Sequence, residues 1–227
     1  MKYFEFLKRV SQFLYIYLIV LSTFLKIKLT TGNFFFAQVG ANDGKSGDPF
    51  FHLVNLLKWN GIMFEPVPYV FEKLKNNYKN NKNIYLENKA LTIEGGELKF
   101  YYLKKSNNPN LPQWYDQIGS FNLEVLKKHK SSIPDFENLL THSEVKTTNF
   151  DEIIKKYKLK NIDLIFIDTE GYDYEIIKMI PFEKISPSII LFEHKHLSKK
   201  DFNESLKKLT NLGYKHFLTR DDFLFYK

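Results

Sequence analysis

Short apolar runs alternate with segments of helical hydrophobic spacing along most of this chain, and this alternation limits the possible folds more than any other feature. Apolar runs typical of strands lie at residues 34–39, 62–64, 84–86, 98–103, 163–167 and 189–192. Helical spacing of apolar residues occurs at 50–59, 69–78, 150–157, 174–180 and 202–209. Strands that alternate with helices predict a doubly wound α/β fold with a mostly parallel sheet.

The last two apolar runs, at 214–219 and 223–226, are separated only by Arg220-Asp221-Asp222. So short a connection indicates an antiparallel hairpin, because parallel strands need a long crossover between them. We therefore expect one antiparallel strand at or near the end of the otherwise parallel sheet.

The composition excludes several classes of protein. The 227 residues are 44% hydrophobic, which is enough apolar material for one sizeable core. The chain has no cysteine, which excludes a disulfide scaffold and a cysteine nucleophile and favours a reducing, cytoplasmic compartment. The net charge is +7, but only Arg9 and Arg220 among the 33 basic residues are arginines. Because nucleic-acid recognition relies heavily on arginine, we expect no nucleic-acid partner.

Residues 1–32 form an N-terminal apolar segment with an uncharged run from Val10 to Leu25. As a helix this run spans about 24 Å, less than the roughly 30 Å hydrocarbon core of a membrane. Three placements are open for the segment: packed on the domain that follows, lying at a membrane surface, or anchored across a membrane. Lysines flank the run, so one expectation is peripheral membrane contact through residues 1–28.

We expect residues 33–227 to form one domain, interrupted at 104–147 by a long segment without clear periodicity. Long segments of this kind inside a compact domain usually have a function, so one interpretation is a lid or substrate wall. Trp114 and Tyr115 would then offer stacking faces to a sugar. The alternative is a surface excursion with its own short helix at 123–129.

The first two strands carry features that favour a nucleoside cofactor. The first strand runs into the loop Gly40-Ala41-Asn42-Asp43-Gly44, where glycines let the backbone approach a ligand closely. The second strand leads to Glu65, which is placed to accept hydrogen bonds from both hydroxyls of a ribose. The glycine spacing differs from the G-x-G-x-x-G pattern of dinucleotide-binding proteins.

Two later strands also end in polar residues. The strand at 163–167 leads to Asp168, which this fold directs into the ligand crevice. The strand at 189–192 leads to Glu193-His194-Lys195-His196, and period-two alternation sends His194 and His196 to one side. Two histidines are too few for a metal centre without a third ligand, so we expect no metal. One histidine at this edge is suited to be a general base.

These pieces, in this order, resemble the FkbM family of S-adenosylmethionine-dependent methyltransferases, from about Phe34 to the C-terminus. The motifs that carry the resemblance are Gly40-Ala41-Asn42-Asp43-Gly44, Phe64-Glu65-Pro66-Val67-Pro68, Gly119-Ser120, Thr148–Ile154 and Ile162–Gly171. The last of these motifs is the most specific. The chain departs from many relatives at Gln38, where they carry Asp, and at Phe166, where they carry Lys.

The resemblance implies a Rossmann-like class I methyltransferase fold with S-adenosylmethionine as the cofactor. It also implies where the cofactor is held: its methionyl part by Gly40, Asn42 and Gly44, its ribose by Glu65, and its adenine near Asn88 and Ala90, with Ser120 as a further cofactor-binding candidate. Asp168 would border both the cofactor and the methyl acceptor.

The function that the resemblance implies is O-methylation of a sugar, a glycan or a secondary metabolite. A hydroxyl is a weak acid and needs a nearby base, for which Asp168 and His194 are the candidates. Two alternatives stay open from the residues. The glycine loop and Glu65 also suit a NAD-type oxidoreductase, and the N-terminal segment also suits a non-catalytic, membrane-associated binding module.

Overall fold

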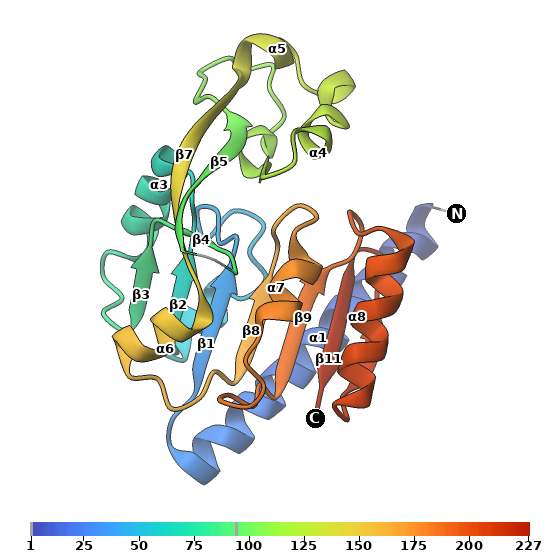
Figure 1. Ribbon diagram of the computed structural model, residues 1–227. Helices are drawn as coiled ribbons and strands as arrows, with labels where there is room; N and C mark the ends of the chain where they lie inside the picture. Colours follow the sequence, from blue (N-terminus) through green and yellow to red (C-terminus); the bar gives the residue numbers. More distant parts are fainter. Residues whose placement is uncertain (1, 94) are drawn as a thin grey trace.

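The computed structural model describes residues 2–93 and 95–227, with side chains from Leu7 onward, and its strands form two sheets (Figure 1). The larger sheet has the order β10-β11-β9-β8-β1-β2-β3. Its strands are β1 (Phe35–Val39), β2 (Asn60–Phe64), β3 (Ile84–Glu87), β8 (Leu164–Ile167), β9 (Ile189–Glu193), β10 (Lys215–Leu218) and β11 (Asp222–Tyr226). Only β11 runs antiparallel to its two neighbours. The doubly wound α/β fold and its C-terminal hairpin are thus confirmed.

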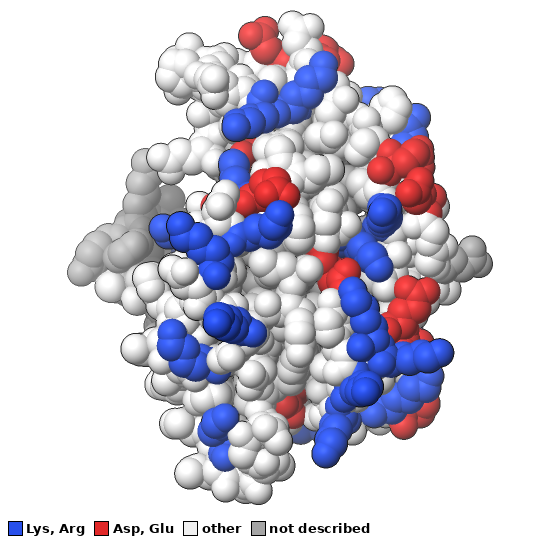
Figure 2. Space-filling view, turned by 90° about the vertical axis from the view of Figure 1, so that its left-hand side faces the viewer, with Lys and Arg blue, Asp and Glu red and all other residues white. Residues whose placement is uncertain are grey.

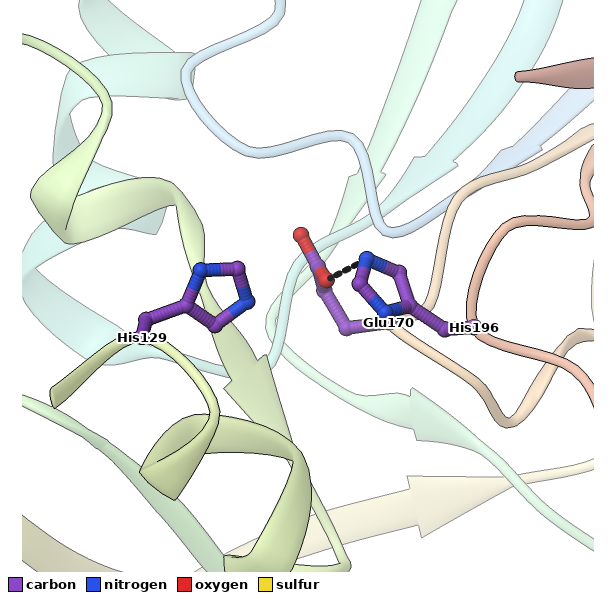
Figure 3. Close-up of side chains that lie close together, drawn as sticks. All are labelled: His129, Glu170 and His196. Carbon is purple, nitrogen blue, oxygen red and sulfur yellow. Dashed lines mark ion pairs between the residues drawn. The ribbon is translucent and has the colours of Figure 1, made fainter. Parts of the chain in front are cut away.

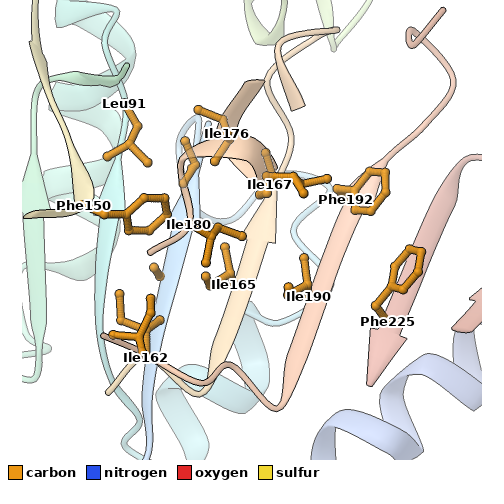
Figure 4. Close-up of a cluster of buried hydrophobic side chains, with 14 of the residues drawn as sticks. Leu91, Phe150, Ile162, Ile165, Ile167, Ile176, Ile180, Ile190, Phe192 and Phe225 are labelled. Atoms are coloured by element: carbon orange, nitrogen blue, oxygen red, sulfur yellow. The ribbon is translucent and has the colours of Figure 1, made fainter. Parts of the chain in front are cut away.

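Three helices cover one face of the larger sheet: α6 (Phe150–Tyr157), α7 (Asp173–Met179) and α8 (Lys199–Asn211). Figure 4 shows the apolar side chains that fill the space between these helices and the strands. In β8, Ile165 and Ile167 belong to this core, whereas Leu164 and Phe166 belong to the core on the opposite face. A strand buried on both faces needs a continuous apolar run, which explains the sequence of β8.

The opposite face is covered by α1 (Lys2–Thr31), α2 (Phe51–Leu56) and α3 (Pro68–Tyr78). Helix α2 is shorter than expected because Lys58, just beyond its end, adopts a left-handed backbone conformation. Three α1 residues four positions apart, Ile16, Val20 and Phe24, are buried against this face. Of the three placements left open for the N-terminal segment, the structure has α1 packed on the sheet.

The smaller sheet has the order β4-β7-β5-β6 and stands beyond the carboxyl ends of β1 and β2 (Figure 1). Its strands are β4 (Ala90–Leu91), β5 (Gly96–Leu103), β6 (Gly119–Ser120) and β7 (Leu140–Thr148). Short helices lie between β5 and β7, namely η1 (Tyr115–Gln117), α4 (Leu123–Lys127), η2 (Lys130–Ser132) and α5 (Phe136–Leu139). Within the expected insertion at 104–147, residues 140–147 form a strand that pairs along the whole of β5, and β6 adds a further strand.

The basic residues are spread over the surface. On the face shown in Figure 2, Lys and Arg side chains lie in several groups, one of them at the lower right, with uncharged residues and with Asp and Glu between the groups. A charge distribution of this kind is typical of a solvated surface.

Candidate functional site

A pocket opens at the carboxyl ends of β1, β2 and β8, where parallel α/β sheets bind their ligands. The empty space in and around it, open mouth included, is about 600 Å³. Its walls come from the strand ends of the larger sheet, from β4, and from the segment between η1 and β6. The residues that line it include Gly40, Asn42, Glu65, Val67, Lys89, Ala90, Asp116, Gln117, Ile118, Gly119, Phe121, Asp168, Glu170 and Tyr172.

Gly40 brings the chain after β1 into close contact with the chain after β8. Its φ is +79°, and a Cβ added to it would lie 1.8 Å from the carbonyl oxygen of Asp168. The amides of Gly40 and Ala41 both donate to the Phe64 carbonyl oxygen, at 3.1 and 2.9 Å. Only glycine fits here, which explains the residue that begins the loop.

Glu65 follows β2 and holds the glycine loop in place. One of its carboxylate oxygens accepts a hydrogen bond from the Asn42 amide at 2.9 Å, and the other accepts one from the Val67 amide at 2.8 Å. Burial raises the pKa of Glu65 to about 7. Each carboxylate oxygen can accept a second hydrogen bond, so Glu65 is free to receive two ligand hydroxyls from the pocket.

Three of the predicted cofactor residues act on the protein itself. A Cβ at Gly44 would lie 2.5 Å from Leu74, and the Gly44 carbonyl oxygen accepts a hydrogen bond from the Tyr78 hydroxyl at 3.1 Å. Gly44 therefore supports the packing of α3 and is not among the residues that line the pocket. Asn88 donates to the carbonyl oxygens of Glu65 and Pro66 at 2.8 and 3.0 Å. Ser120 is buried and accepts a hydrogen bond from the amide of Asn122 at 3.2 Å.

Asp168 stands at the rim of the pocket, beside Gly40. The Asp168 side chain is exposed to the pocket, but the protein atoms around it desolvate its carboxyl group. This desolvation raises the pKa of Asp168 well above its usual value, and the nearby carboxylates of Glu170 and Glu193 raise it further. Burial likewise raises the pKa of Glu170 to about 7. Carboxyl groups shifted toward neutrality in a cleft are typical of sites that bind or transfer protons.

His194 is not brought together with Asp168. It lies outside the described residues that line the pocket, its Nε2 is 3.3 Å from the Thr219 carbonyl oxygen, and its ring packs against Phe202 and Phe223. The expected alternation is wrong because β9 ends at Glu193 and the chain then turns.

His196, rather than His194, contacts a residue that lines the pocket, Glu170. Its Nε2 is 3.2 Å from Glu170 Oε2 and 3.5 Å from Glu193 Oε2, and Figure 3 shows His129 facing the same carboxylate. Burial lowers the pKa of His196 to about 4, so its ring is neutral at pH 7. Sequence reasoning did not single out His129, since nothing in its local sequence indicates that it meets residues after β8 and β9.

A second, more polar cavity adjoins the first and shares Asn42, Gln117, Asp168 and Glu170 with it. Its other walls include Ser46, Asp48 and Pro49 of the loop that follows the glycines. The two cavities meet at Asp168 and Glu170, so these two carboxyl groups can contact ligands on both sides.

The aromatic residues expected to face a substrate have other partners. The Trp114 ring packs against His129 at a centroid distance of 5.5 Å, and the Tyr115 hydroxyl bonds to the backbone of Ser106. The insertion closes the pocket with Gln117, Ile118, Gly119 and Phe121 instead.

Comparison with known proteins places this architecture among methyltransferases. The family model described as the methyltransferase FkbM domain matches residues 38–216. No curated protein matches the chain. The crystal structure of methyltransferase FkbM from Methylobacillus flagellatus KT is similar with a TM-score of 0.51 and 15% identity, over 86% of this chain and 44% of that chain. This chain therefore spans less than half the length of that protein.

Two further solved structures match over comparable parts of the chain. The N-terminal domain of human METTL16 in complex with SAH has a TM-score of 0.46 and 12% identity, over 93% of this chain and 68% of that one. Precorrin-6y C5,15-methyltransferase from Geobacter metallireducens GS-15 has a TM-score of 0.41 and 12% identity, over 86% and 82%.

Proposed function

The chain belongs to the FkbM methyltransferase domain family, and we propose that it transfers the methyl group of S-adenosylmethionine to a hydroxyl group of a sugar, a glycan or a secondary metabolite. The observation that carries this proposal is the acid-lined pocket at the carboxyl ends of β1, β2 and β8. When bound there, the cofactor supplies an electrophilic methyl carbon on a positively charged sulfur.

The residues of the pocket suit the parts of this cofactor. The close backbone approach at Gly40 leaves room for the methionyl part beside the loop, and Glu65 has spare acceptor capacity for two ribose hydroxyls. Val67, Ala90 and Ile118 offer apolar surface to the adenine. The resemblance of the sequence to FkbM methyltransferases is confirmed by the family match.

The charge of the pocket favours this cofactor over a nicotinamide dinucleotide. Among the described lining residues the charged ones are Glu65, Lys89, Asp116, Asp168 and Glu170, four acids against one lysine. The ionised carboxylates among these acids would attract a cationic sulfonium and repel the diphosphate of NAD. A bound cation would also favour the ionised forms of the two glutamates.

Asp168 is the base that we assign to the acceptor hydroxyl. It faces both cavities, so an acceptor in the polar cavity and a cofactor in the first pocket would meet beside its carboxylate. Asp168 would accept the hydroxyl proton as the oxygen takes the methyl carbon and the carbon–sulfur bond breaks, which would release S-adenosylhomocysteine. His194 has no such position, and the base assignment therefore rests on Asp168 alone.

We further propose that the protein is cytoplasmic and that α1 contacts a membrane surface while it stays packed on the sheet. The stretch Leu7–Thr31 is long and apolar enough to cross a membrane by length and composition. Opposite its buried stripe, α1 exposes Leu7, Leu14, Leu18, Leu25 and Leu29. An exposed apolar stripe with lysines near it is typical of helices that lie at a lipid surface.

Titration calorimetry with S-adenosylhomocysteine, the demethylated product, tests the proposed cofactor. We expect binding by the wild type that weakens at least about tenfold in Glu65→Gln, equivalent to roughly 1.4 kcal/mol. Glu72→Gln is the matched control, because Glu72 is an exposed glutamate on α3 whose salt bridge is with Lys75. Folded wild-type protein that fails to bind would refute the proposal.

Flotation with anionic vesicles tests the membrane contact. We expect the wild type to float with vesicles that contain phosphatidylserine and Leu14→Ser/Leu18→Ser to remain in the soluble fraction, with unchanged thermal stability because both residues are exposed. Equal flotation of the two proteins would contradict the proposed contact between α1 and the membrane surface.

A further inference from the structure

Two histidines and a glutamate converge beside Asp168, and each comes from a different segment of the chain (Figure 3). His129 precedes η2 in the insertion, Glu170 follows β8, and His196 follows β9. One ligand atom from each residue lies within 4.8 Å of those of the other two. The Glu193 carboxylate lies 3.5 Å from the His196 ring on the same side as Glu170.

Three buried polar atoms of this cluster make no hydrogen bond. Within the described part of the chain these are His129 Nε2, Glu170 Oε2 and Glu193 Oε2. His196 Nε2 lies 3.2 Å from Glu170 Oε2, within ion-pair distance but without the geometry of a hydrogen bond. Buried polar atoms without hydrogen bonds are costly unless a cation or a proton satisfies them.

The spacing also suits a metal ion. Tetrahedral ligands about 2.0–2.1 Å from Zn²⁺ are separated from one another by about 3.3 Å. The separations of His196 Nε2 from Glu170 Oε2 and Glu193 Oε2, 3.2 and 3.5 Å, are close to this value, and the ligand atoms of His129, Glu170 and His196 all lie within 4.8 Å of one another. Two imidazoles and a carboxylate form a donor set for zinc and related transition metals rather than for Mg²⁺.

We propose that His129, Glu170 and His196 bind a divalent transition-metal ion, beside the Glu193 carboxylate. The sequence did not indicate this site because it showed only two histidines near one another, and the third ligand comes from the insertion. By joining the insertion to the ends of β8 and β9, the ion would hold the wall of the pocket against the larger sheet.

The place of the site suggests a role in the reaction, and this role rests on the proposed function. Glu170 lines both cavities together with Asp168, so an ion held by its buried Oε2 would lie next to the wall that the two cavities share. A divalent cation there would favour the ionised form of Asp168, which is the form that can accept the hydroxyl proton.

Metal binding itself is the test. Protein dialysed against EDTA is titrated with Zn²⁺ by calorimetry, and with Co²⁺ by visible absorption, which reports the ligand field directly. We expect about one ion per wild-type chain, with affinity at least about tenfold weaker in His129→Ala and in His196→Ala. His52→Ala is the control, because His52 is exposed on α2 and should leave binding unchanged.

The outcomes separate the site from the proposed function. Failure of folded wild-type protein to bind either ion, or binding that both variants retain in full, would overturn the metal site. S-adenosylhomocysteine binding is measured on the same samples with and without added Zn²⁺, so absence of binding in both states would count against the methyltransferase proposal alone. Thermal unfolding of each variant verifies that it is folded before its affinity is compared.

Discussion

At the scale of single residues, Gly40 and Gly47 have similar backbones but very different surroundings. Their φ angles are +79° and +75°, but an added Cβ meets the Asp168 carbonyl at Gly40 and nothing within 4 Å at Gly47. We expect Gly40→Ala to lower the free energy of unfolding by at least about 3 kcal/mol, and Gly47→Ala by only about 1 kcal/mol. Urea unfolding measures both, and equal losses would contradict the proposed contact between the β1 and β8 loops.

Glu65 gives the ligand affinity a pH dependence of known sign. Ribose hydroxyls donate to the ionised carboxylate, and the pKa of Glu65 in the folded protein is about 7. We therefore expect S-adenosylhomocysteine to bind about tenfold more tightly at pH 8 than at pH 6. Calorimetry of Glu65→Gln should show no such change, and an equal pH effect in that variant would assign it to another group.

The same carboxyl affects stability in the opposite direction. Its pKa is raised from 4.5 when unfolded to about 7 when folded, so between these values the native state binds more protons. The contribution of Glu65 to the free energy of unfolding is therefore largest below pH 4.5 and falls as the pH rises to 7. Thermal melts of wild type and Glu65→Gln across this range should diverge accordingly.

At the scale of elements, α1 is an integral part of the fold rather than an appendage. Val20 is fully buried between α1 and the sheet, whereas Leu18, two residues away, is 54% exposed. We expect Val20→Ala to cost about 2 kcal/mol in urea unfolding and Leu18→Ala to change stability by less than about 0.5 kcal/mol. Similar small effects at both positions would mean that α1 does not pack on the sheet in solution.

At the scale of the whole molecule, the pocket is closed by two parts that are far apart in the sequence. Gln117, Ile118 and Gly119 of the insertion face the strand ends of the larger sheet across it. We expect bound S-adenosylhomocysteine to slow amide hydrogen exchange in residues 115–121 by about tenfold or more, because ligand binding opposes local opening. Helix α8, which lies outside the pocket lining, serves as the internal reference, and protection confined to the larger sheet would contradict this closure.

The candidate site was predictable where local sequence carries the chemistry. Gly40 after β1 and Glu65 after β2 are recognisable from the sequence because each directly follows its own strand. The end of the strand therefore sets where the Gly40 backbone and the Glu65 carboxylate lie. Gly44 and Asn88 lie in the expected region, but Gly44 supports the packing of α3, and Asn88 donates a hydrogen bond to the backbone after β2. Only the tertiary structure shows that these residues contact the protein itself. His194 and His196 were expected on one side, but His196 meets Glu170 and His194 meets Thr219, since β9 ends at Glu193 and the chain then turns.

The sequence by itself determined the larger sheet, its antiparallel last strand and the glycine loop with Glu65, because hydrophobic period, turn length and residue type are local properties. Only the tertiary structure decided that β7 pairs with β5, that α1 packs on the sheet, and that His129 meets Glu170 and His196. These contacts join segments far apart in the chain. Their formation depends on how apolar surfaces from different segments pack together. The hydrophobic periodicity of a single segment does not predict that packing.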